Sequence, residues 1–387
     1  MIVKNESKII ERCITSCLPI IDAYSICDTG STDNTVQVIE EVSKQKNLKG
    51  FVYNDTWKNF GYNRSNSFIF CLETAKKLNY DLKDTYALLL DADMCIKMDK
   101  SFNKKKLNEA GYKVIQKNNN LTYYNIRLIQ LSCPWKCLGV THEYWEANDS
   151  CKVIKYDSLY TVDINDGGCK DDKFERDISL LTQGIKDEPE NARYYFYLAQ
   201  SYMDSDKMKE CIEWYKKRIE KGGWSEEVYY SMLKIGLAYK NLMKPEKAIF
   251  WFLKAHNFRP SRAEAIYEAL NIYRLTHEYN TAYMLGKTAK SIPYPKDDIL
   301  FISHNVYDYL IDFEMSIVCF YVGHSKAKEG YEYCTSLLKN PSVPQNIKDM
   351  TLKNINFYKN SLSEENDCIE KFEEAKVKIK IKKNIKI

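Results

Sequence analysis

The chain has 387 residues, of which 44% are hydrophobic and 13% aromatic. This composition is typical of a folded globular protein and excludes an intrinsically disordered one. The formal net charge is only +4, so the charge balance gives no reason to expect a nucleic-acid partner. No apolar run reaches the length of a membrane span. We therefore expect two domains and no transmembrane segment.

The 13 cysteines are scattered along the chain and form no CxxC pair. Zinc ribbons and thioredoxin-like sites use such pairs, so neither is expected. Most of these cysteines stand in apolar runs, as is typical of small buried residues in a reducing compartment. No signal peptide precedes the first apolar run. These features predict a cytoplasmic protein.

Short strands alternate with helical stretches over the first 100 residues. In this region, the apolar runs that predict strands cover residues 2–3, 24–27, 50–54 and 86–91. Residues 100–170 are less regular, with strand-like runs at 123–131 and 152–160. The stretches with helical spacing cover residues 8–18 and 34–45. Alternation of this kind predicts a mostly parallel sheet with helices on both faces.

Beyond about residue 172 the spacing is helical almost everywhere, and an internal repeat emerges. Ala199 and Tyr202 are matched 37 residues later by Gly236 and Tyr239, and a further shift of 34 residues leads to Tyr273. A small residue followed by an aromatic one, at a period of about 34 residues, is the tetratricopeptide pattern. We therefore predict an all-α tetratricopeptide-like domain, in which small residues let paired helices approach closely.

These patterns divide the chain into three parts. Residues 1–171 are expected to form the α/β domain, and residues 172–365 the helical domain. Residues 366–387 form a basic tail whose last dozen residues carry six lysines and no acid. The tail is interpreted as a solvated end of the chain or as a contact for an anionic surface.

Two acids, Asp91 and Asp93, follow the apolar residues 88–90 at the end of a predicted strand. Like-charged carboxylates in a desolvated place repel each other unless a cation is present. A divalent metal bound to carboxylate oxygens and to a diphosphate would remove this cost. The alternative is a plain turn at the end of a strand.

Residues 26–35 form a second polar motif. Asp28 closes a predicted strand, Gly30 permits a tight turn, and the next three residues are able to cap a helix. The start of that helix offers backbone N–H groups that favour anions. An ordinary turn needs only the glycine and one cap, so the additional polar residues indicate a ligand.

The motifs that carry a family resemblance lie at residues 1–7, 28–35, 57–67, 88–94, 139–146, 165–181, 192–202 and 212–231. In this order they resemble family 2 glycosyltransferases, in the subgroup that fuses a GT-A domain to tetratricopeptide-like helices. The resemblance covers roughly residues 1–260. It implies a Rossmann-like GT-A fold and inverting sugar transfer from a nucleotide sugar. Members usually have several residues before the first-strand methionine, so we expect a short first strand here or an incomplete start.

The resemblance also implies roles for individual residues. Asn5 and Glu6 would lie beside the nucleotide, and Asp28 would contact the base or the ribose. Arg64, and with it Asn66, would face the diphosphate or the donor sugar.

The same resemblance aligns Asp91 and Asp93 with the D-x-D motif of the family. Asp93 is the expected direct ligand of a divalent metal, Mn²⁺ or Mg²⁺, with Asp91 beside it. His142 is a candidate for binding the metal or a phosphate oxygen, and the alternative is a buried, hydrogen-bonded histidine.

An inverting transfer needs a base for the acceptor hydroxyl and a positive charge for the leaving diphosphate. Glu143 is the first choice for the base and Asp166 the second. Lys170 follows Gly167–Gly168 in a loop that could close near phosphate, although an ordinary turn fits this segment equally well.

The predicted function is therefore an inverting, metal-assisted glycosyltransferase. The donor is expected to be a nucleotide sugar, with a UDP-sugar as the first choice, and the acceptor a protein, peptide or glycan. The helical repeats would hold the acceptor or a second copy in a homodimer. Two alternatives remain: a non-catalytic scaffold with a relic nucleotide-binding domain, and a nucleotidyltransferase, whose Gly-rich loop the first strand lacks.

Overall fold

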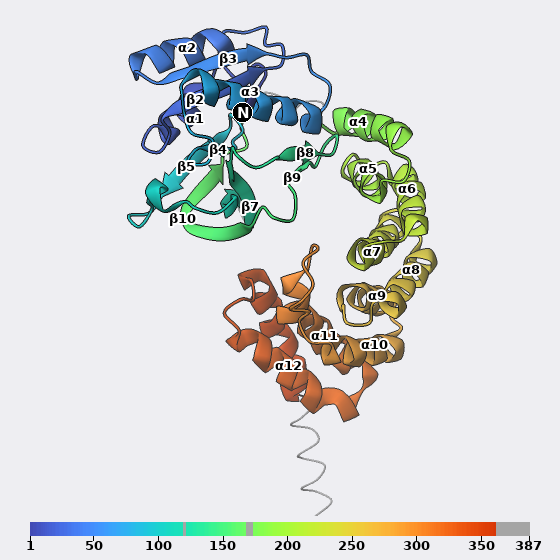
Figure 1. Cartoon of the computed structure of the whole chain (residues 1–387). Helices are drawn as coiled ribbons and strands as arrows, with labels where there is room; N and C mark the ends of the chain where they lie inside the picture. Colours follow the sequence, from blue (N-terminus) through green and yellow to red (C-terminus); the bar gives the residue numbers. More distant parts are fainter. Residues whose placement is uncertain (119–120, 168–172, 361–387) are drawn as a thin grey trace, which may run out of the picture. The chain divides into compact units, whose positions relative to one another are not determined.

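The computed structural model describes residues 1–118, 121–167 and 173–360 (Figure 1). Packing divides the chain into two compact units, Met1–Tyr197 and Leu198–Ile387. Within the described ranges, no helix combines the length and the apolar character that crossing a membrane requires. Lys170 and the predicted tail, residues 366–387, lie outside the described residues.

The first unit opens with a three-stranded parallel sheet. The short β1 (Ile2–Val3) and β3 (Lys49–Asn54) pair with the two edges of β2 (Ala23–Asp28), in the order β1-β2-β3. Between them run α1 (Ile10–Cys17) and α2 (Thr35–Gln45), each with one buried apolar face. Each strand returns through a helix, and such a crossover makes neighbouring strands parallel. The predicted alternation of strands and helices is confirmed here.

A five-stranded sheet follows in the order β4-β7-β6-β10-β5. Its strands are β4 (Tyr86–Leu88), β5 (Met94–Met98), β6 (Gly111–Asn118), β7 (Leu121–Gln130) and β10 (Val153–Asp163). β6 and β10 pair in parallel, whereas the other three pairs are antiparallel. The parallel arrangement expected from the sequence thus holds for the first sheet, whereas the second sheet is mostly antiparallel.

The helix α3 (Phe60–Lys77) packs against β2 and against the hairpin of β8 (Lys136–Leu138) and β9 (Tyr144–Glu146). The Asn59 side chain caps its start by accepting a hydrogen bond from the N–H of Tyr62. At Gly61 a Cβ atom would lie 2.4 Å from the carbonyl oxygen of Gly139. This close approach, which only glycine permits, brings the first turn of α3 beside the chain that leaves β8.

Two helices beyond the sheets also pack on the first unit. They are α4 (Lys173–Asp187) and the start of α5 (Ala192–Asp204). The Thr141 hydroxyl donates to Oδ1 of Asp177 on α4 at 3.3 Å, and a Cβ at Gly184 would lie 3.1 Å from Val140. The domain limits expected from the sequence, with a boundary after residue 171, remain a prediction.

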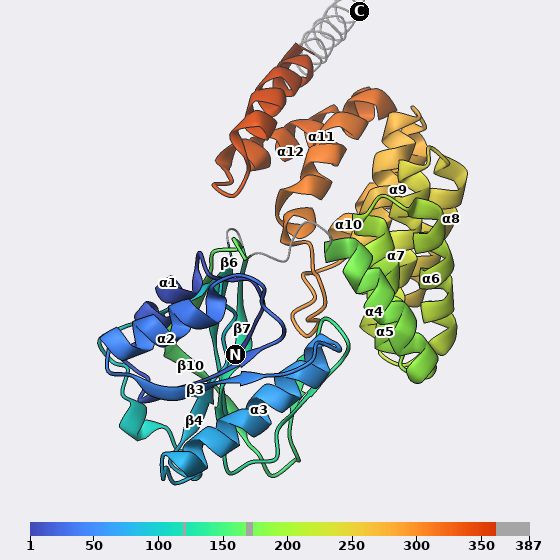
Figure 2. The same cartoon turned by 90° about the horizontal axis from the view of Figure 1, so that it is seen from above.

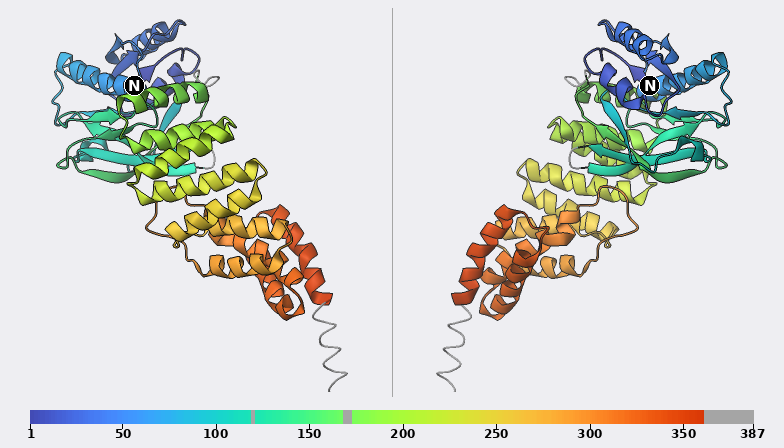
Figure 3. Two further views of the ribbon diagram at one scale, coloured as in Figure 1. Left: turned by 90° about the vertical axis from the view of Figure 1, so that its right-hand side faces the viewer. Right: turned by 90° about the vertical axis from the view of Figure 1, so that its left-hand side faces the viewer.

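The second unit is an array of antiparallel helices (Figures 2 and 3). Its α-helices include α6 (Met208–Lys221), α7 (Ser225–Asn241), α8 (Pro245–Phe258), α9 (Glu264–Leu275), α10 (Tyr279–Ser291), α11 (Ile311–Val322) and α12 (Ala327–Lys339), and residues 345–360 are helical as well. Consecutive helices from α6 to α12 pack on one another in chain order. The chain thus has an α/β part followed by an all-α repeat part, as the sequence predicts.

The predicted repeat is visible in the turns of three helix pairs. Each turn places one residue in the left-handed region at the same point: Asp206 (φ 60°), Met243 (φ 56°) and His277 (φ 65°). These residues are 37 and 34 residues apart, the offsets found in the sequence. The residue after each donates its N–H to the carbonyl of a repeat tyrosine: Lys207 to Tyr202, Lys244 to Tyr239 and Glu278 to Tyr273.

The small positions of the repeat let the helices meet closely. A Cβ atom on Gly236 of α7 would lie 2.4 Å from the ring of Phe252 on α8, which is fully buried. Ala248, at the small position that opens α8, is fully buried as well. The alternation of small and aromatic residues is therefore the packing pattern of the array.

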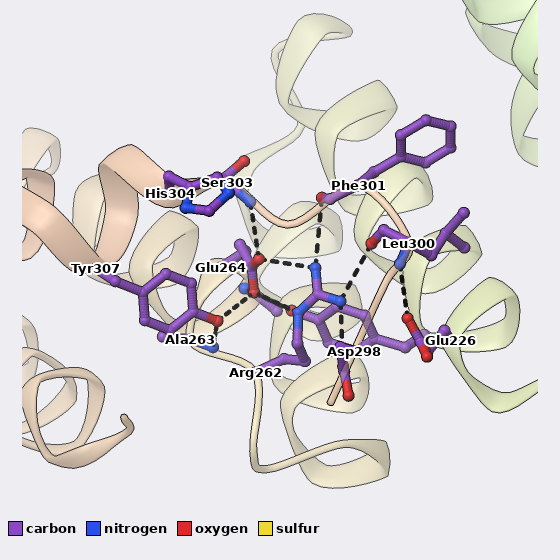
Figure 4. Close-up of polar contacts among 12 residues, drawn as sticks. Glu226, Arg262, Ala263, Glu264, Asp298, Leu300, Phe301, Ser303, His304 and Tyr307 are labelled. Atoms are coloured by element: carbon purple, nitrogen blue, oxygen red, sulfur yellow. Dashed lines mark hydrogen bonds and ion pairs between the residues drawn. The ribbon is translucent and has the colours of Figure 1, made fainter. Parts of the chain in front are cut away.

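A buried ion network holds the loop between α10 and α11 (Figure 4). The fully buried Arg262 donates to both oxygens of Glu264, at 2.9 and 2.7 Å, and to Oδ2 of Asp298 at 3.3 Å. Arg259 makes two further bonds to Asp298, at 2.8 and 2.5 Å. Glu226 accepts the backbone N–H groups of the two residues after Asp298. The loop is therefore fixed to α7, α9 and the α8–α9 connection.

Replacing Arg262 by methionine should destabilise the helical unit strongly. The change leaves Glu264 buried without its cation, which costs about 3–5 kcal/mol in comparable buried pairs. Calorimetric unfolding should show a lower transition temperature, whereas Lys296→Met, at an exposed position of the same loop, should change it little. A similar effect of both variants would contradict the role assigned to the network.

The same network predicts a loss of stability in acid. Arg259 and Arg262 lower the pKa of Asp298 below its ordinary value, so the folded state binds this proton less readily than the unfolded chain. The stabilisation is complete above the ordinary pKa of about 4 and is lost as the pH falls through the lower folded value. Unfolding measured between pH 6 and about pH 2 should lose part of this slope in the Asp298→Asn variant.

Candidate functional site

Hydrogen bonds tie the ends of β1 and β2 together. Asn5, which adopts a left-handed backbone (φ 57°), donates its N–H to the Ser31 hydroxyl at 3.0 Å and accepts the N–H of Thr32 at 2.7 Å. The Asp28 carboxylate accepts the N–H groups of Gly30 and Ser31, at 3.2 and 3.0 Å. Asn5 and Asp28, both predicted site residues, therefore both bind residues 30–32 of the loop that follows β2.

A second set of contacts joins the β1 end to the start of α2. The N–H of Glu6 donates to the Thr35 hydroxyl at 2.7 Å, and the N–H of Ser7 donates to Asp33 at 3.2 Å. Although desolvation opposes ionisation, hydrogen bonds from Ser7 and Thr35 lower the pKa of Asp33 to about 2. The loop between β2 and α2 is therefore rigid and carries a fixed negative charge.

An ion cluster forms where α3 meets the end of the β4 segment. Arg64 donates from Nη2 to Oδ1 of Asp91 at 2.6 Å and from Nε to Oε1 of Glu143 at 2.7 Å. A second arginine, Arg127 on β7, lies with Nη1 3.9 Å from Oδ2 of Asp91. The structure therefore groups three of the predicted site residues and adds one that the sequence analysis missed.

The electrostatics of this cluster follow from burial and charge. Burial alone would raise the pKa of Asp91, but Arg64 and Arg127 outweigh it and lower that pKa below its ordinary value. Burial, assisted by Arg64, lowers the pKa of Arg127, although Asp91, Tyr123 and Glu143 act in the opposite direction. Asp91 is consequently ionised at neutral pH and engaged by two cations.

The second acid of the D-x-D motif has different neighbours. Asp93 stands in the turn before β5, where its carbonyl accepts the N–H of Ile164 at 3.0 Å. A Cβ atom on Gly167 would lie 3.1 Å from Oδ2 of Asp93 and 3.5 Å from Oε1 of Glu6. The carboxylates of Asp93 and Glu6 therefore both lie beside Gly167, whereas the carboxylate of Asp91 is hydrogen-bonded to Arg64.

The three predicted metal ligands do not assemble. Among the described residues, no group of three or more His, Cys, Asp or Glu side chains is placed to hold a metal. The His142 ring stacks on Tyr197, with centroids 4.0 Å apart and planes at 11°, and its carbonyl accepts a hydrogen bond from Arg193. A magnesium-type site needs only one or two carboxylates when a diphosphate supplies further oxygens. Asp93, with Glu6 nearby, fits that smaller requirement.

The two candidate bases lie in different surroundings. Glu143 belongs to the ion cluster, whereas Asp166 accepts two hydrogen bonds from Arg12 on α1, at 2.8 and 2.7 Å. The Arg12–Asp166 pair is partly exposed. The geometry thus separates Asp166 from Arg64 and Asp91.

Asn66 takes part in a clasp between β3 and α3. The amides of Asn66 and Asn63 both donate to Oδ2 of Asp55, each at 2.9 Å, and the N–H of Asp55 donates to the carbonyl of Asp28. Asp55 was not among the predicted site residues. It ends the predicted strand 50–54 as Asp28 ends its neighbour, and that pattern could have revealed it.

The clasp predicts unequal effects of two neighbouring substitutions. Asn63 is fully buried and makes four hydrogen bonds, whereas Asn66 is partly exposed and bonds to Asp55. Asn63→Ala should cost about 1–3 kcal/mol of unfolding free energy for each buried group left unpaired. Asn66→Ala should cost clearly less. Chemical denaturation checks both values, and equal losses would contradict the clasp.

Comparison with known proteins gives one family match. Residues 1–103 match the model described as "Glycosyl transferase family 2". A search of the curated proteins found no match.

Solved structures of tetratricopeptide proteins are similar to part of the chain. YrrB, "a TPR protein with an unusual peptide-binding site", is 11% identical over 47% of this chain and 84% of its own, with a TM-score of 0.35. MamA is 19% identical over 43% and 82%, with a TM-score of 0.34. A thermophilic TPR protein from Thermus thermophilus is 13% identical over 47% and 91%, with a TM-score of 0.33. The first 103 residues of the chain are therefore similar to family 2 glycosyltransferases, and the helices of the second unit repeat in the tetratricopeptide manner.

Proposed function

We propose that the chain is an inverting glycosyltransferase that moves a sugar from a nucleotide-sugar donor to an acceptor hydroxyl. The observation that carries this proposal is the ion cluster in which Arg64 joins Asp91 of the D-x-D motif to Glu143. Such a cluster combines a carboxylate able to act as a base with a cation able to bind a departing phosphate.

The proposed base is Glu143. In the structure, Nε of Arg64 donates a hydrogen bond to Oε1 of Glu143. A diphosphate carries more negative charge than Glu143 and binds guanidinium groups in a bidentate manner. Donor binding would therefore draw Arg64 towards the phosphates and leave Glu143 able to accept the proton of the acceptor hydroxyl. Asp166, which is paired with Arg12, is the second candidate.

We propose a divalent cation, Mn²⁺ or Mg²⁺, as the cofactor. When bound, it would stabilise the negative charge of the leaving diphosphate. Asp93 is the proposed ligand, and Glu6 is a second acid beside Gly167. His142 receives no role here, because its ring is stacked on Tyr197.

Donor, acceptor and location follow the same proposal. Asn5 and Asp28, at the joined ends of β1 and β2, would hold the nucleoside, with UDP as the first choice. The helical repeats would hold a protein, peptide or glycan acceptor, or a second copy of the chain. The eleven cysteines of the described ranges are free thiols, which fits a reducing compartment such as the cytoplasm.

A second candidate is a non-catalytic scaffold with a relic nucleotide-binding domain. The hydrogen bonds that Arg64 donates to Asp91 and to Glu143 favour the scaffold, because each bond occupies one carboxylate oxygen of an acid that the catalytic proposal uses. The two candidates differ in one outcome, the turnover of a nucleotide sugar.

Hydrolysis of nucleotide sugars tests the proposal. The protein should slowly hydrolyse one member of a panel of UDP-, GDP- and dTDP-sugars in the presence of Mn²⁺. Glu143→Gln should lower the rate by about 10²–10⁴-fold, the usual contribution of a general base, and Asp93→Asn should abolish the dependence on Mn²⁺.

Asp22→Asn is a matched control, since Asp22 forms an exposed pair with Lys104 in the same unit. It should retain the rate of the unaltered protein. Hydrolysis that survives in both Glu143→Gln and Asp93→Asn would overturn the assignment of these residues. Calorimetry that detects no binding of UDP, GDP or dTDP would favour the scaffold.

A further inference from the structure

Asp91 faces two arginines, and they are held in different ways. Arg64 makes a hydrogen bond of 2.6 Å to Oδ1, whereas Arg127 stands 3.9 Å from Oδ2, beyond hydrogen-bond reach. The side chain of Arg127 is buried, and the residue is only 8% exposed. The two cations therefore have different relations to the same carboxylate.

Arg127 is fixed to the sheet. Its Nη2 donates to Oε1 of Gln116 on β6 at 2.7 Å, and its Nη1 donates to the carbonyl of Leu89 at 3.3 Å. The N–H of Leu89 donates in return to the carbonyl of Arg127 at 2.8 Å. Gln116 is itself buried and also accepts a bond from Asn125. Arg127 cannot leave Asp91 without breaking these bonds.

Arg64 is held in a way that a ligand can replace. Its guanidinium hydrogen bonds go to carboxylates, one each to Asp91 and Glu143, and none goes to a backbone carbonyl of the described residues. Carboxylates and phosphates present the same acceptor geometry to a guanidinium. A diphosphate could therefore take over Arg64 from either acid.

Burying the charge of Arg127 is costly. Its Nε atom is buried, and no described residue accepts a hydrogen bond from it. The ion pair with Asp91 is long, so the attraction returns only part of the desolvation energy. An apolar side chain would pack at this position at lower cost, which indicates that the charge itself has a use.

The charges of the cluster show what this use is. In the structure, Arg64 and Arg127 balance Asp91 and Glu143. If Arg64 turned to a diphosphate and Arg127 were absent, the partly buried Asp91 would keep only the Met1 ammonium as a cation, which lowers the pKa of Asp91 less than either arginine does, and its charge would be costly to hold there. That cost would oppose the movement of Arg64.

We propose that Arg127 is a positioning residue of the donor site: it is the permanent counter-charge of Asp91, and it thereby releases Arg64 to bind the diphosphate of the donor. The inference rests on the proposed function for the identity of the ligand. It extends that function, because it assigns fixed and exchangeable roles to two arginines of one cluster.

Pyrophosphate is a suitable probe because it carries the diphosphate chemistry of every nucleotide donor. Its binding is measured by calorimetry in EDTA, so that no metal contributes, with the full chain and with Arg127→Met, Arg127→Lys, Arg64→Met and the double variant Arg64→Met/Arg127→Met. Thermal unfolding of each variant reports whether it is folded.

Arg127→Met should weaken pyrophosphate binding by about tenfold, the scale of coupling between residues that share a partner. Arg127→Lys, which retains the charge, should recover most of this loss. In the Arg64→Met background, Arg127→Met should have no further effect. Arg218→Met is a matched control, since Arg218 is a buried arginine of the helical unit paired with Glu227; it should lower the unfolding temperature and leave pyrophosphate binding unchanged.

The following binding results would overturn the inference. Unchanged binding in a folded Arg127→Met protein, or a loss in a folded Arg127→Lys protein as large as in Arg127→Met, would leave Arg127 as a structural brace between β4 and β7. Additive losses from the Arg64 and Arg127 changes would show that Arg127 does not act through Arg64. Failure of the unaltered chain to bind pyrophosphate would reject the exchange of Arg64, while sugar-nucleotide hydrolysis could still support the proposed function. Conversely, Arg127-dependent binding without hydrolysis would reject the proposed function alone.

Discussion

The candidate site depends on a single guanidinium group that two carboxylates share. Arg64 projects from α3, Asp91 follows β4, and Glu143 lies on the chain between β8 and β9. Each acid would be costly to bury alone, so the three segments stabilise one another only when all are in place. The close approach of Gly61 to Gly139 brings α3 near enough for this contact. The packing of two backbones therefore determines whether the charges can meet.

Two of the ion networks among the described residues illustrate different uses of arginine. Arg262 has five hydrogen bonds, including two to backbone carbonyls of the loop it holds, and it is fully buried. Arg64 has two, both to carboxylates, and its side chain retains some exposure. A guanidinium that bonds to backbone in several directions fixes a structure. One that bonds only to acids, near solvent, can exchange them for another anion.

Features formed by residues close together in the sequence were predicted better than features formed by residues far apart in it. The offsets of 37 and 34 residues predicted the helical repeat, and the turns at Asp206, Met243 and His277 have the same spacing. Each of these turns is formed by residues that are neighbours in sequence. The antiparallel pairs of the second sheet escaped prediction, since strand period alone does not set direction. Arg127 escaped because its partners are distant in sequence: Gln116 lies on β6, and Leu89 directly follows β4. A lone charge inside the apolar strand 123–131 was the available signal.

The two acids of the D-x-D motif have different neighbours in the structure. Asp91 is bound between two arginines, which already satisfy its charge and leave little reason for it to attract a further cation. Asp93 faces Glu6 across Gly167, and two acids near one another favour a bound cation. Strand alternation would place residues 91 and 93 on the same face, but residues 92–93 form a turn before β5, closed by the N–H of Met94 donating to the carbonyl of Asp91, and this turn gives the two acids different neighbours. In the proposed site, Asp91 would therefore position the arginine that binds the diphosphate, and Asp93 would be the acid suited to a metal.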